Sequence, residues 1–351
     1  MRVLVTGHHG YIGSVLAPYI AAAGHDVVGL DTQFYRGCDF GVEASPISGR
    51  VTDIRDVTPT DLAGLEAIVH LAALSNDPLG DLDPRLTERI NGDATLLLAR
   101  AARDAGVRRF VFASSCSMYG ASGTDESLDE QAALRPLTPY AESKVRAEEG
   151  LFALAGPEFA PVSMRNGTAF GASPRLRLDI VLNNLAAWAH TTGRIRLLSD
   201  GMAWRPLVHI RDIAKAALEL LDAPEEQIRG EAFNIGTDEQ NYLVRDLAEV
   251  VSAVTDCAVE FAEGSSADQR SYRVDFSKLA RTFPGLELEW DAARGARELT
   301  EAYRRVGLTP EDFDGNRYVR LRRLMSLLDE GGLDDDLRWR SPVAPDLYRQ
   351  S

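Results

Sequence analysis

A tyrosine and a lysine four positions apart form the most reactive pair in the sequence. They are Tyr140 and Lys144 in the segment PYAESK, and this spacing places both side chains on one face of a helix. A free phenol has a pKa of about 10 and is a poor base at neutral pH, but a neighbouring ammonium group stabilises the phenolate. Such pairs also occur on solvated helix faces, so the chemistry of this one depends on its surroundings.

A second reactive cluster ends an apolar run. The segment FVFASSCSMYG places three hydroxyl groups and one thiol within four positions, from Ser114 to Ser117. A buried strand rarely ends in this way for packing alone. We therefore expect part of the cluster to take part in chemistry, with Cys116 either a small buried side chain or a proton donor or acceptor.

A third cluster is the glycine-rich loop TGHHGYIG at residues 6–13, which follows the first apolar run and opens a helical stretch. Gly7, Gly10 and Gly13 allow a tight turn and the close approach of a pyrophosphate to the helix N-terminus. The two histidines are adjacent and point in different directions, so we expect no metal site. The loop predicts a dinucleotide-binding site.

The second strand adds a carboxylate to this site. It ends in GLD, which places Asp31 18 residues after Gly13. A carboxylate here accepts hydrogen bonds from the adenosine ribose and repels a 2′-phosphate, which favours NAD over NADP. The positive nicotinamide ring of NAD⁺ would then act together with Lys144 on Tyr140. Lowering the phenol pKa by about 3 units requires about 4 kcal/mol of differential stabilisation.

The elements that position these groups alternate between strands and helices. Helical stretches occur at 12–23 and 94–105. Between them lie short apolar runs of the kind that form buried parallel strands, at 3–5, 27–30, 68–71 and 110–113. This alternation predicts an α/β fold with a Rossmann-type, doubly wound parallel sheet.

The second half of the chain is less regular. We expect strands at 162–165 and 233–235 and helices at 179–190, 213–221, 243–254 and 318–328. No repeat or low-complexity linker separates the halves, so we expect a smaller α/β substrate-binding lobe that is interleaved with the first domain. The expected boundaries are 1–165 for the dinucleotide-binding domain, to which 208–242 returns, and 166–207 with 243–351 for the second lobe and a C-terminal helical tail.

Composition limits the environment and the partners. The chain has 351 residues and a net charge of -15, which argues against non-specific binding to nucleic acid or an anionic membrane. Its three cysteines, Cys38, Cys116 and Cys257, form neither a disulfide framework nor a metal-ligand spacing, so we expect a reducing cytoplasm. The sequence opens directly on the strand MRVLVTG, so we expect no signal peptide, and no apolar run approaches the ~20 residues of a membrane span.

The motifs together resemble the extended short-chain dehydrogenase/reductase family, in the epimerase/dehydratase branch that acts on nucleotide-activated sugars. The resemblance covers most of the chain, up to the segment RSYRVDFSK at 270–278. The matching elements are TGHHGYIG, Asp31, Asp53–Ile54, HLAA at 70–73, Asn91, SSCSMYG, YAESK, RNGTAFG at 165–171, NNL at 183–185 and WRPLVHIRD at 204–212.

The resemblance implies roles for single residues. The family's catalytic serine or threonine lies four positions before the tyrosine of the YG pair, which is Ser115 here, and it would act with Tyr140 and Lys144. For NAD binding it implies Gly7, Gly10, Tyr11, Ile12, Gly13, Asp31, Asp53, Ile54, Leu71, Ala72, Ala73, Asn91, Tyr140, Lys144 and Asn166. For a nucleotide-diphosphate sugar it implies Ser75, Cys116, Ser117, Thr168, Asn184, Arg205 and Arg270.

The positions after Ser115 separate the family's reactions. Its sugar 4,6-dehydratases carry an acid and a base, usually Asp-Glu, where this chain has Cys116 and Ser117, and its 3,5-epimerising members carry a cysteine where this chain has Ser117. The resemblance therefore favours an NAD-dependent nucleotide-sugar epimerase acting at C4 through a keto-sugar. The alternatives are a 4-ketoreductase or dehydrogenase that releases its cofactor, a dehydratase, and a non-catalytic nucleotide-sensing protein.

Two departures from the family argue against a specific assignment to UDP-galactose. Thr168 replaces an asparagine that many members have three residues before the glycine of this segment. Asn166 stands where the uridine-sugar 4-epimerases place an aromatic residue beside the nicotinamide. The base of the nucleotide is not indicated by the sequence.

Family members commonly dimerise through a four-helix bundle, to which each subunit gives two helices. The corresponding stretches here are 94–105 and 140–155. Their apolar residues either form this homodimer interface or pack only within the monomer; they are Leu97, Leu98, Ala101, Val145, Leu151 and Leu154.

Overall fold

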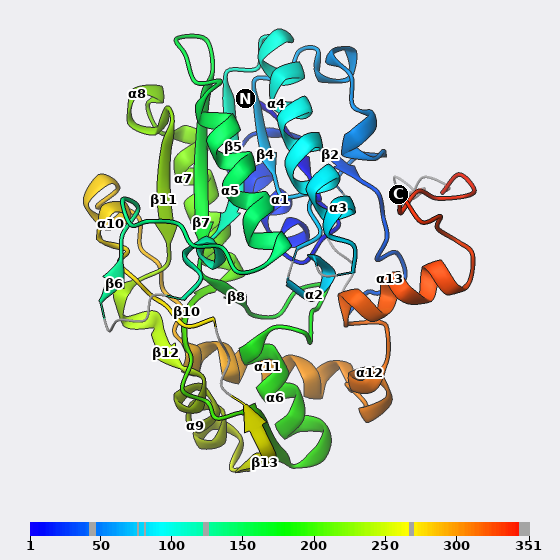
Figure 1. Ribbon diagram of the computed structural model, residues 1–351, viewed down its shortest axis with the longest axis vertical. Helices are drawn as coiled ribbons and strands as arrows, with labels where there is room; N and C mark the ends of the chain where they lie inside the picture. The colour runs from blue at the N-terminus through cyan, green and yellow to red at the C-terminus, as the bar shows by residue number, and fades with distance from the viewer. Residues whose placement is uncertain (42–46, 76, 81, 122–125, 267–269, 344–351) are drawn as a thin grey trace.

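A seven-stranded parallel sheet is the central element of the computed structural model, which describes residues 1–41, 47–75, 77–80, 82–121, 126–266 and 270–343 (Figure 1). The strand order is β11-β7-β5-β4-β1-β2-β3, and every neighbouring pair is parallel. This is the expected Rossmann-type sheet. Its strands are β1 (Arg2–Thr6), β2 (Asp26–Asp31), β3 (Gly49–Val51), β4 (Ala67–His70), β5 (Arg109–Ser115), β7 (Ala160–Asn166) and β11 (Glu231–Ile235).

Helices cover both faces of this sheet (Figure 1). Alternate residues of β1 point to opposite sides. Val3 packs in a core with α1 (Gly13–Ala22) and α7 (Ile210–Asp222), whereas Leu4 packs in a core with α4 (Ala94–Asp104) and α5 (Pro139–Phe152). Because the sheet is buried on both faces, its strands read as continuous apolar runs, which is why the sequence located them.

The strand order reverses between β1 and β4, and this point determines where a ligand can bind. From β1 the chain proceeds outward to β2 and β3, and from β4 it proceeds in the other direction to β5 and β7. At such a switch point the loops after two neighbouring strands diverge and leave a crevice at the carboxyl ends. The TGHHGYIG loop and the HLAA segment both lie at this edge.

A smaller group of strands and helices lies below the large sheet in Figure 1. Its strands pair as β12-β10-β8, as β13-β9 and as β14-β6. They are β6 (Ser127–Leu128), β8 (Thr168–Phe170), β9 (Arg194–Ser199), β10 (Trp204–His209), β12 (Asn241–Leu243), β13 (Ala258–Ser266) and β14 (Arg273–Val274). We expected the segment 208–242 to return to the dinucleotide-binding domain. In this region β11 belongs to the large sheet, whereas β10 and β12 pair outside it. The division of the chain into two lobes remains a prediction.

Three long helices form the core of this smaller part. They are α6 (Val181–Thr192), α9 (Val244–Thr255) and α11 (Ala292–Val306), and they bury Leu182, Leu247 and Leu299 together. The sequence analysis did not anticipate α11. The other helices are short or near the C-terminus: α2 (Asp77–Gly80), α3 (Pro84–Thr87), α8 (Glu225–Ile228), α10 (Ser277–Thr282), α12 (Pro310–Asp314) and α13 (Arg320–Asp329). Short 3-10 helices occur at η1 (Ile54–Asp56), η2 (Pro59–Leu62), η4 (Cys116–Tyr119) and η5 (Asp238–Gln240), and the π-helix η3 (Glu88–Asp93) connects α3 directly to α4.

The two helices expected to form a dimer interface lie side by side, α4 against α5 (Figure 1). Leu98 and Leu151 point into the core of their own subunit and are 1% exposed, whereas Leu97 is 55% exposed. Charged residues, among them Arg100 and Glu142, share the outer surface with Leu97. Dimerisation remains a prediction. In the described part of the chain, the helices are too short or too polar to cross a bilayer.

Gly295 of α11 permits the closest contact between a helix and the strand that carries Thr168. A Cβ added there would lie 2.2 Å from Cε2 of Phe170, whose side chain is fully buried. Alanine usually favours a helix interior over glycine by about 1 kcal/mol. We nevertheless expect Gly295→Ala to lower the free energy of unfolding by about 1–3 kcal/mol, because Phe170 must move. Denaturant titration tests this, and Arg297→Ala, at an exposed site on the same helix, should change stability by less than about 0.5 kcal/mol. Stabilisation by Gly295→Ala would show that the contact can relax.

Candidate active site

A cavity of about 560 Å³ opens at the carboxyl ends of the large sheet, at the switch point. The glycine loop and Asp31 line one part of it, and Ser115, Tyr140 and Lys144 line another. The part that faces the smaller lobe is lined by residues that include Asn184, Arg205 and Arg270. One continuous space therefore reaches the residues expected to bind the cofactor, to catalyse and to bind the substrate.

The glycine loop is a close-packed backbone turn. The amide of Gly10 donates to the carbonyl of Gly7 at 2.9 Å, and Gly7 has a φ of 73°, a conformation that favours glycine. A Cβ on Gly7 would lie 2.9 Å from the amide nitrogen of Ala72, and one on Gly13 would lie 2.1 Å from the Gly7 carbonyl oxygen. The turn exposes backbone at the N-terminus of α1, and Tyr11 lines the cavity there together with the glycines. This exposed backbone fits a pyrophosphate.

Asp31 is fixed at the end of β2 by two backbone amides. Its carboxylate accepts a hydrogen bond from the amide of His9 at 3.0 Å and another from the amide of Gln33 at 2.7 Å. Further along the cavity wall, Ile54 contributes its side chain, while the carboxylate of Asp53 pairs with Arg55 at 2.7 Å. These walls fit the ribose and the base of an adenosine.

Asn91 does not line the cavity, although the sequence analysis assigned it to cofactor binding. Its side-chain oxygen accepts from the amide of Leu74 at 2.8 Å, and its nitrogen donates to the Leu74 carbonyl and, at 3.2 Å, to Ser143. It therefore ties the loop after β4 to α5. Leu71, Ala72, Ala73, Leu74 and Ser75 do line the cavity, so the contacts of Asn91 suit a positioning residue.

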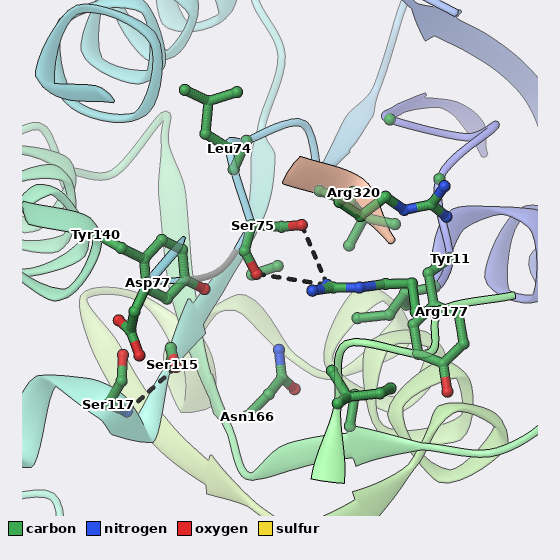
Figure 2. A pocket seen from close by; sticks show the side chains of 18 of the residues that line it. Tyr11, Leu74, Ser75, Asp77, Ser115, Ser117, Tyr140, Asn166, Arg177 and Arg320 are labelled. Atoms are coloured by element: carbon green, nitrogen blue, oxygen red, sulfur yellow. Dashed lines mark hydrogen bonds between the residues drawn. The ribbon is translucent and has the colours of Figure 1, made fainter. Parts of the chain in front are cut away.

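The hydroxyl, phenol and ammonium groups of the expected catalytic set meet in the cavity. Ser115 ends β5 and Tyr140 lies in the first turn of α5; both side chains line the cavity, and Figure 2 shows them beside Asp77. The ammonium of Lys144 donates to the carbonyl of Ala113 at 2.8 Å and lies 5.7 Å from the centre of the Tyr140 ring. The spacing predicted this shared helix face.

Burial shifts the ionisation of this set. Burial, together with the Asp77 carboxylate, raises the pKa of Tyr140 to about 12, and hydrogen bonding to Ser115 and the charge of Arg177 oppose this shift only in part. Burial also lowers the pKa of Lys144 to about 7. Without a cofactor, the chain's own groups therefore do not lower the phenol pKa, and the lowering expected with NAD⁺ bound remains a prediction. It would require positive charge from a ligand, because the buried lysine loses much of its own.

Asp77 is a carboxylate in the cavity that the sequence analysis missed. Its oxygens accept from the Thr138 hydroxyl at 2.6 Å and from the Arg270 guanidinium at 2.5 Å. The pairing holds Arg270, expected to bind a diphosphate, close to the phenol of Tyr140. No spacing rule links positions 77, 138 and 270, so only the fold could reveal this group.

All but one of the residues expected to bind substrate line the cavity, and the exception is Cys116. Ser75, Ser117, Thr168, Asn184 and Arg205 line the cavity together with Arg270. Among the residues that the structure describes, the Ser117 hydroxyl and the side-chain oxygen of Asn166 are buried without a hydrogen-bond partner, so both remain available to a ligand.

Cys116 lies outside the cavity. Its side chain is fully buried, and its thiol donates to the carbonyl of Arg165 at 3.0 Å. Burial raises the thiol's pKa far above its ordinary value, so the group stays protonated. Behind it, Arg165 forms a buried ion pair with Glu148 at 2.5 Å. The geometry gives no support to a substrate contact by Cys116, and the expected alternative of a small buried side chain describes it better.

The titratable histidine below the glycine loop is structural. His70 lies between the hydroxyl of Thr6, at 2.7 Å, and that of Thr95, at 2.8 Å. Burial lowers its pKa to about 3, so it is neutral at physiological pH. In the described part of the chain, no three His, Cys, Asp or Glu side chains are grouped so that they could hold a metal ion.

Lys144→Met should stabilise the ligand-free protein more at pH 6 than at pH 10. The lysine has a pKa of about 7 when folded and an ordinary value of 10.5 when unfolded. Between these values the unfolded chain binds more protons, so the lysine destabilises the fold fully below the lower pKa and progressively less up to the higher one. The advantage of the variant in unfolding free energy should thus fall by about 3–5 kcal/mol between pH 6 and pH 10, as measured by denaturant titration.

The control for this measurement is Lys215→Met, which removes a lysine from α7 whose side chain is 24% exposed and pairs with Glu289. Solvent reaches this ammonium group, so we expect no comparable dependence on pH. An advantage of Lys144→Met that stays constant from pH 6 to pH 10 would contradict the lowered pKa.

Known proteins with related sequences and structures share this arrangement of elements. A "UDP-glucose 4-epimerase" of Mycolicibacterium smegmatis is 29% identical over 321 residues, which are 87% of this chain and 99% of the relative. The solved structure "MoeE5 in complex with UDP-glucuronic acid and NAD" is 27% identical, with a TM-score of 0.75 over 87% of this chain and 99% of that one. DesIV, a dTDP-glucose 4,6-dehydratase of Streptomyces venezuelae solved with NAD, is 25% identical, with a TM-score of 0.75 over 87% and 97% of the two chains.

The relatives thus include both epimerases and dehydratases, and the solved neighbours hold NAD. A family model described as "NAD dependent epimerase/dehydratase family" matches residues 3–236, which contain the glycine loop, Asp31 and the Ser115, Tyr140 and Lys144 set. This match extends over more than half of the chain. The chain belongs to the NAD-dependent epimerase/dehydratase family.

Proposed function

We propose that this protein is an NAD-dependent nucleotide-sugar epimerase that inverts C4 of a UDP-sugar through a keto-sugar intermediate. The observation that carries the proposal is the continuous cavity, which joins a dinucleotide cradle at Gly7–Gly13 to the Ser115, Tyr140 and Lys144 set and then to the arginines of the smaller lobe. The UDP part rests on the names of the relatives, which are UDP-glucose 4-epimerases and a UDP-glucuronate complex.

The residues of the cavity have distinct tasks in this proposal. Bound NAD⁺ supplies a hydride acceptor at the sugar carbon and, once reduced, a hydride donor. Tyr140 accepts the proton of the C4 hydroxyl, and Ser115, which lines the same cavity, orients the same oxygen. Lys144 would hold the nicotinamide ribose from the same helix face. Tyr140 would need the positive charge of a bound nicotinamide ring to bring its pKa down from the raised value.

The arginines of the smaller lobe suit the diphosphate of the substrate. Arg205 and Arg270 line the cavity, and their guanidinium groups match phosphate oxygens as planar forks. The keto-sugar must present its opposite face before the hydride returns. While the keto-sugar turns, the bound diphosphate keeps the substrate in the cavity. Tyr140 and Ser115 stay in place to return the proton.

A dehydratase is the second candidate, and Asp77 is the observation that favours it. This carboxylate lies beside Tyr140, although the positions after Ser115 hold no acid or base. Both oxygens of Asp77 accept hydrogen bonds, from Thr138 and Arg270, so the group is held as an acceptor rather than free to remove a carbon-bound proton. We therefore place epimerisation first.

We also propose a homodimer through α4 and α5 and a location in the cytoplasm. The exposed Leu97 supports the first, since it leaves apolar surface on the outer side of α4. The free thiols of Cys38, Cys116 and Cys257 support the second, because a reducing compartment preserves them.

NAD⁺ should bind far more tightly than NADP⁺, because the Asp31 carboxylate faces the cavity where a 2′-phosphate would have to lie. Asp31→Ala should narrow the ratio of the two affinities by roughly tenfold or more, as measured by titration calorimetry on cofactor-free protein. Asp26→Ala, at the other end of β2 with a side chain that is 76% exposed, should leave the ratio unchanged. Equal affinity of the wild-type protein for both cofactors would refute the assignment of Asp31.

Epimerisation should proceed in deuterated water without uptake of deuterium at carbon, because the hydride stays within the closed site. UDP-glucose and UDP-glucuronate are the substrates to test, with products followed by NMR and mass spectrometry. Tyr140→Phe should lower the rate on the order of 10²–10⁴, since the proton acceptor is lost while the ring still packs. Tyr19→Phe, which removes a phenol hydroxyl from the exposed side of α1, should leave the rate unchanged.

Other outcomes of this experiment point to the other reactions. Loss of water with deuterium uptake would identify a dehydratase. Stoichiometric release of NADH would identify a dehydrogenase, and consumption of added NADH a ketoreductase. If the protein releases NAD on denaturation but turns over no nucleotide sugar, a nucleotide-sensing role is the remaining alternative.

A further inference from the structure

Two arginines inside the cavity carry nitrogen atoms that nothing in the described part of the chain satisfies. Arg320 is 2% exposed and Arg177 is 6% exposed, yet Nη1 of the first and Nη2 of the second have no hydrogen-bond partner among the described residues. Figure 2 shows both side chains on the same side of the cavity as Tyr11. Buried donors are rarely left unsatisfied in folded proteins, so this arrangement indicates a ligand with acceptor oxygens.

In each guanidinium group, some of the nitrogen atoms donate hydrogen bonds within the protein and one has no partner among the described residues. Arg320 donates from Nη2 to the carbonyl of Arg175 at 2.7 Å, and its guanidinium carbon lies 3.9 Å from the centre of the Tyr35 ring. Arg177 donates from Nε to Asp179 at 2.8 Å and from Nη1 to the hydroxyl of Ser75 at 3.2 Å. The two guanidinium groups are thus held in place before any ligand arrives.

The charges around Arg177 and Arg320 favour the binding of an anion. Asp179 forms the ion pair with Arg177 and also accepts a hydrogen bond from the backbone amide of Arg320 at 3.4 Å. Burial lowers the pKa of Arg320, and the neighbouring charge of Arg177 lowers it further. A bound anion would offset both effects. In a chain with a net charge of -15, two such cations mark a specific site rather than a general surface property.

The surroundings place the pair on the adenosine side of the cavity. Tyr35, on which Arg320 stacks, lies in the loop that follows Asp31, and Thr32 and Phe34 of the same loop line the cavity. The groups expected to hold the substrate diphosphate, Arg205 and Arg270, come instead from β10 and from the segment before β14. The pair is therefore closer in the fold to a dinucleotide than to a nucleotide sugar.

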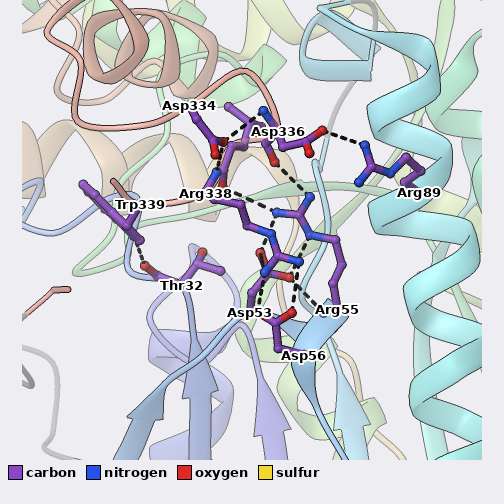
Figure 3. Close-up of polar contacts among 10 residues, drawn as sticks. Thr32, Asp53, Arg55, Asp56, Arg89, Asp334, Asp336, Arg338 and Trp339 are labelled. Atoms are coloured by element: carbon purple, nitrogen blue, oxygen red, sulfur yellow. Dashed lines mark hydrogen bonds and ion pairs between the residues drawn. The ribbon is translucent and has the colours of Figure 1, made fainter. Parts of the chain in front are cut away.

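The segment that carries Arg320 is itself anchored to the walls of the adenosine side (Figure 3). Trp339 donates from its indole nitrogen to the carbonyl of Thr32 at 2.7 Å, and its ring lies 6.1 Å from that of Phe34. Arg338 forms ion pairs with Asp53 at 3.4 Å and with Asp56. These contacts join residues 318–340, which lie outside the range 3–236 that the family model matches, to the segments that follow β2 and β3.

We propose that Arg320 and Arg177 bind the pyrophosphate of the NAD cofactor, so that the segment 318–340 completes the cofactor site. The glycine loop supplies backbone amides to this group, and the two arginines supply charge and forked donors that match phosphate oxygens. Such a site would bind the cofactor more tightly than the glycine loop does alone. The inference rests on the proposed use of NAD, but not on the proposed epimerisation.

The test measures binding of NAD⁺, ADP-ribose and adenosine to cofactor-free Arg320→Met and Arg320→Lys by titration calorimetry or competition. Arg320→Met should weaken NAD⁺ and ADP-ribose by about 10- to 100-fold and leave adenosine unchanged, because only the first two carry a pyrophosphate. Arg320→Lys keeps the charge but loses the fork, and it should fall between wild type and Met. Arg322→Met removes an exposed arginine two positions along α13 and should bind all three probes as wild type does.

Three results would overturn the proposal. The first is unchanged ADP-ribose binding, and the second is an equal loss for adenosine, which would show a general disturbance of the pocket. The third comes from titrating the same variants with NADP⁺ and UDP-glucuronate as well: a loss confined to either of these would assign the pair to a 2′-phosphate or to a sugar carboxylate. Circular dichroism and thermal melting of the ligand-free variants establish that each is folded. Since no arm requires turnover, an inactive or differently specific enzyme would leave these outcomes intact.

Discussion

The close backbone contact at the switch point is the constraint on which the site depends. Gly7 approaches the loop after β4 so tightly that a Cβ would lie 2.9 Å from the amide nitrogen of Ala72, and Gly13 approaches Gly7 still more closely. This contact brings the N-terminus of α1, the end of β2 and the loop after β4 to one place. The neutral His70, bridging Thr6 and Thr95, supports it from below. Larger residues in the loop would separate these elements and open the cradle.

The positively charged side chains of the cavity are held in place by contacts within the protein. The chain is acidic overall, yet the arginines and the lysine of the cavity are placed where an anionic ligand would lie, and each is restrained by a carboxylate, a carbonyl or a ring. Asp77 holds Arg270, Asp179 holds Arg177, and the Ala113 carbonyl holds Lys144. The cations are therefore positioned before binding, which lowers the entropic cost of ordering them around a ligand.

The sequence predicted the parts of the fold and site that follow from local pattern. Apolar runs located the parallel strands, the glycine spacing located the close-packed turn at the cavity, and the separation of Tyr140 and Lys144 placed both on one helix face, where they line the cavity. Their catalytic role remains a prediction. It could not predict groups that tertiary contacts bring together. Asp77, Arg177 and Arg320 come from three distant segments, and no periodicity links them. For Cys116 it left a buried side chain and a reactive group as alternatives, and it could not predict that burial raises the pKa of Tyr140, because both depend on what covers the side chain.

The anchoring of Trp339 to Thr32 joins residues 307 positions apart in the chain. A ribosome makes the strand that ends at Asp31 long before it makes the segment that braces it. During synthesis the large sheet can form while this side of the cavity still lacks its brace, so the adenosine wall acquires its final shape late. Contacts of such long sequence separation slow folding, because the intervening chain must be ordered first. The maturation of the binding site is thereby separated in time from the formation of the sheet that carries it.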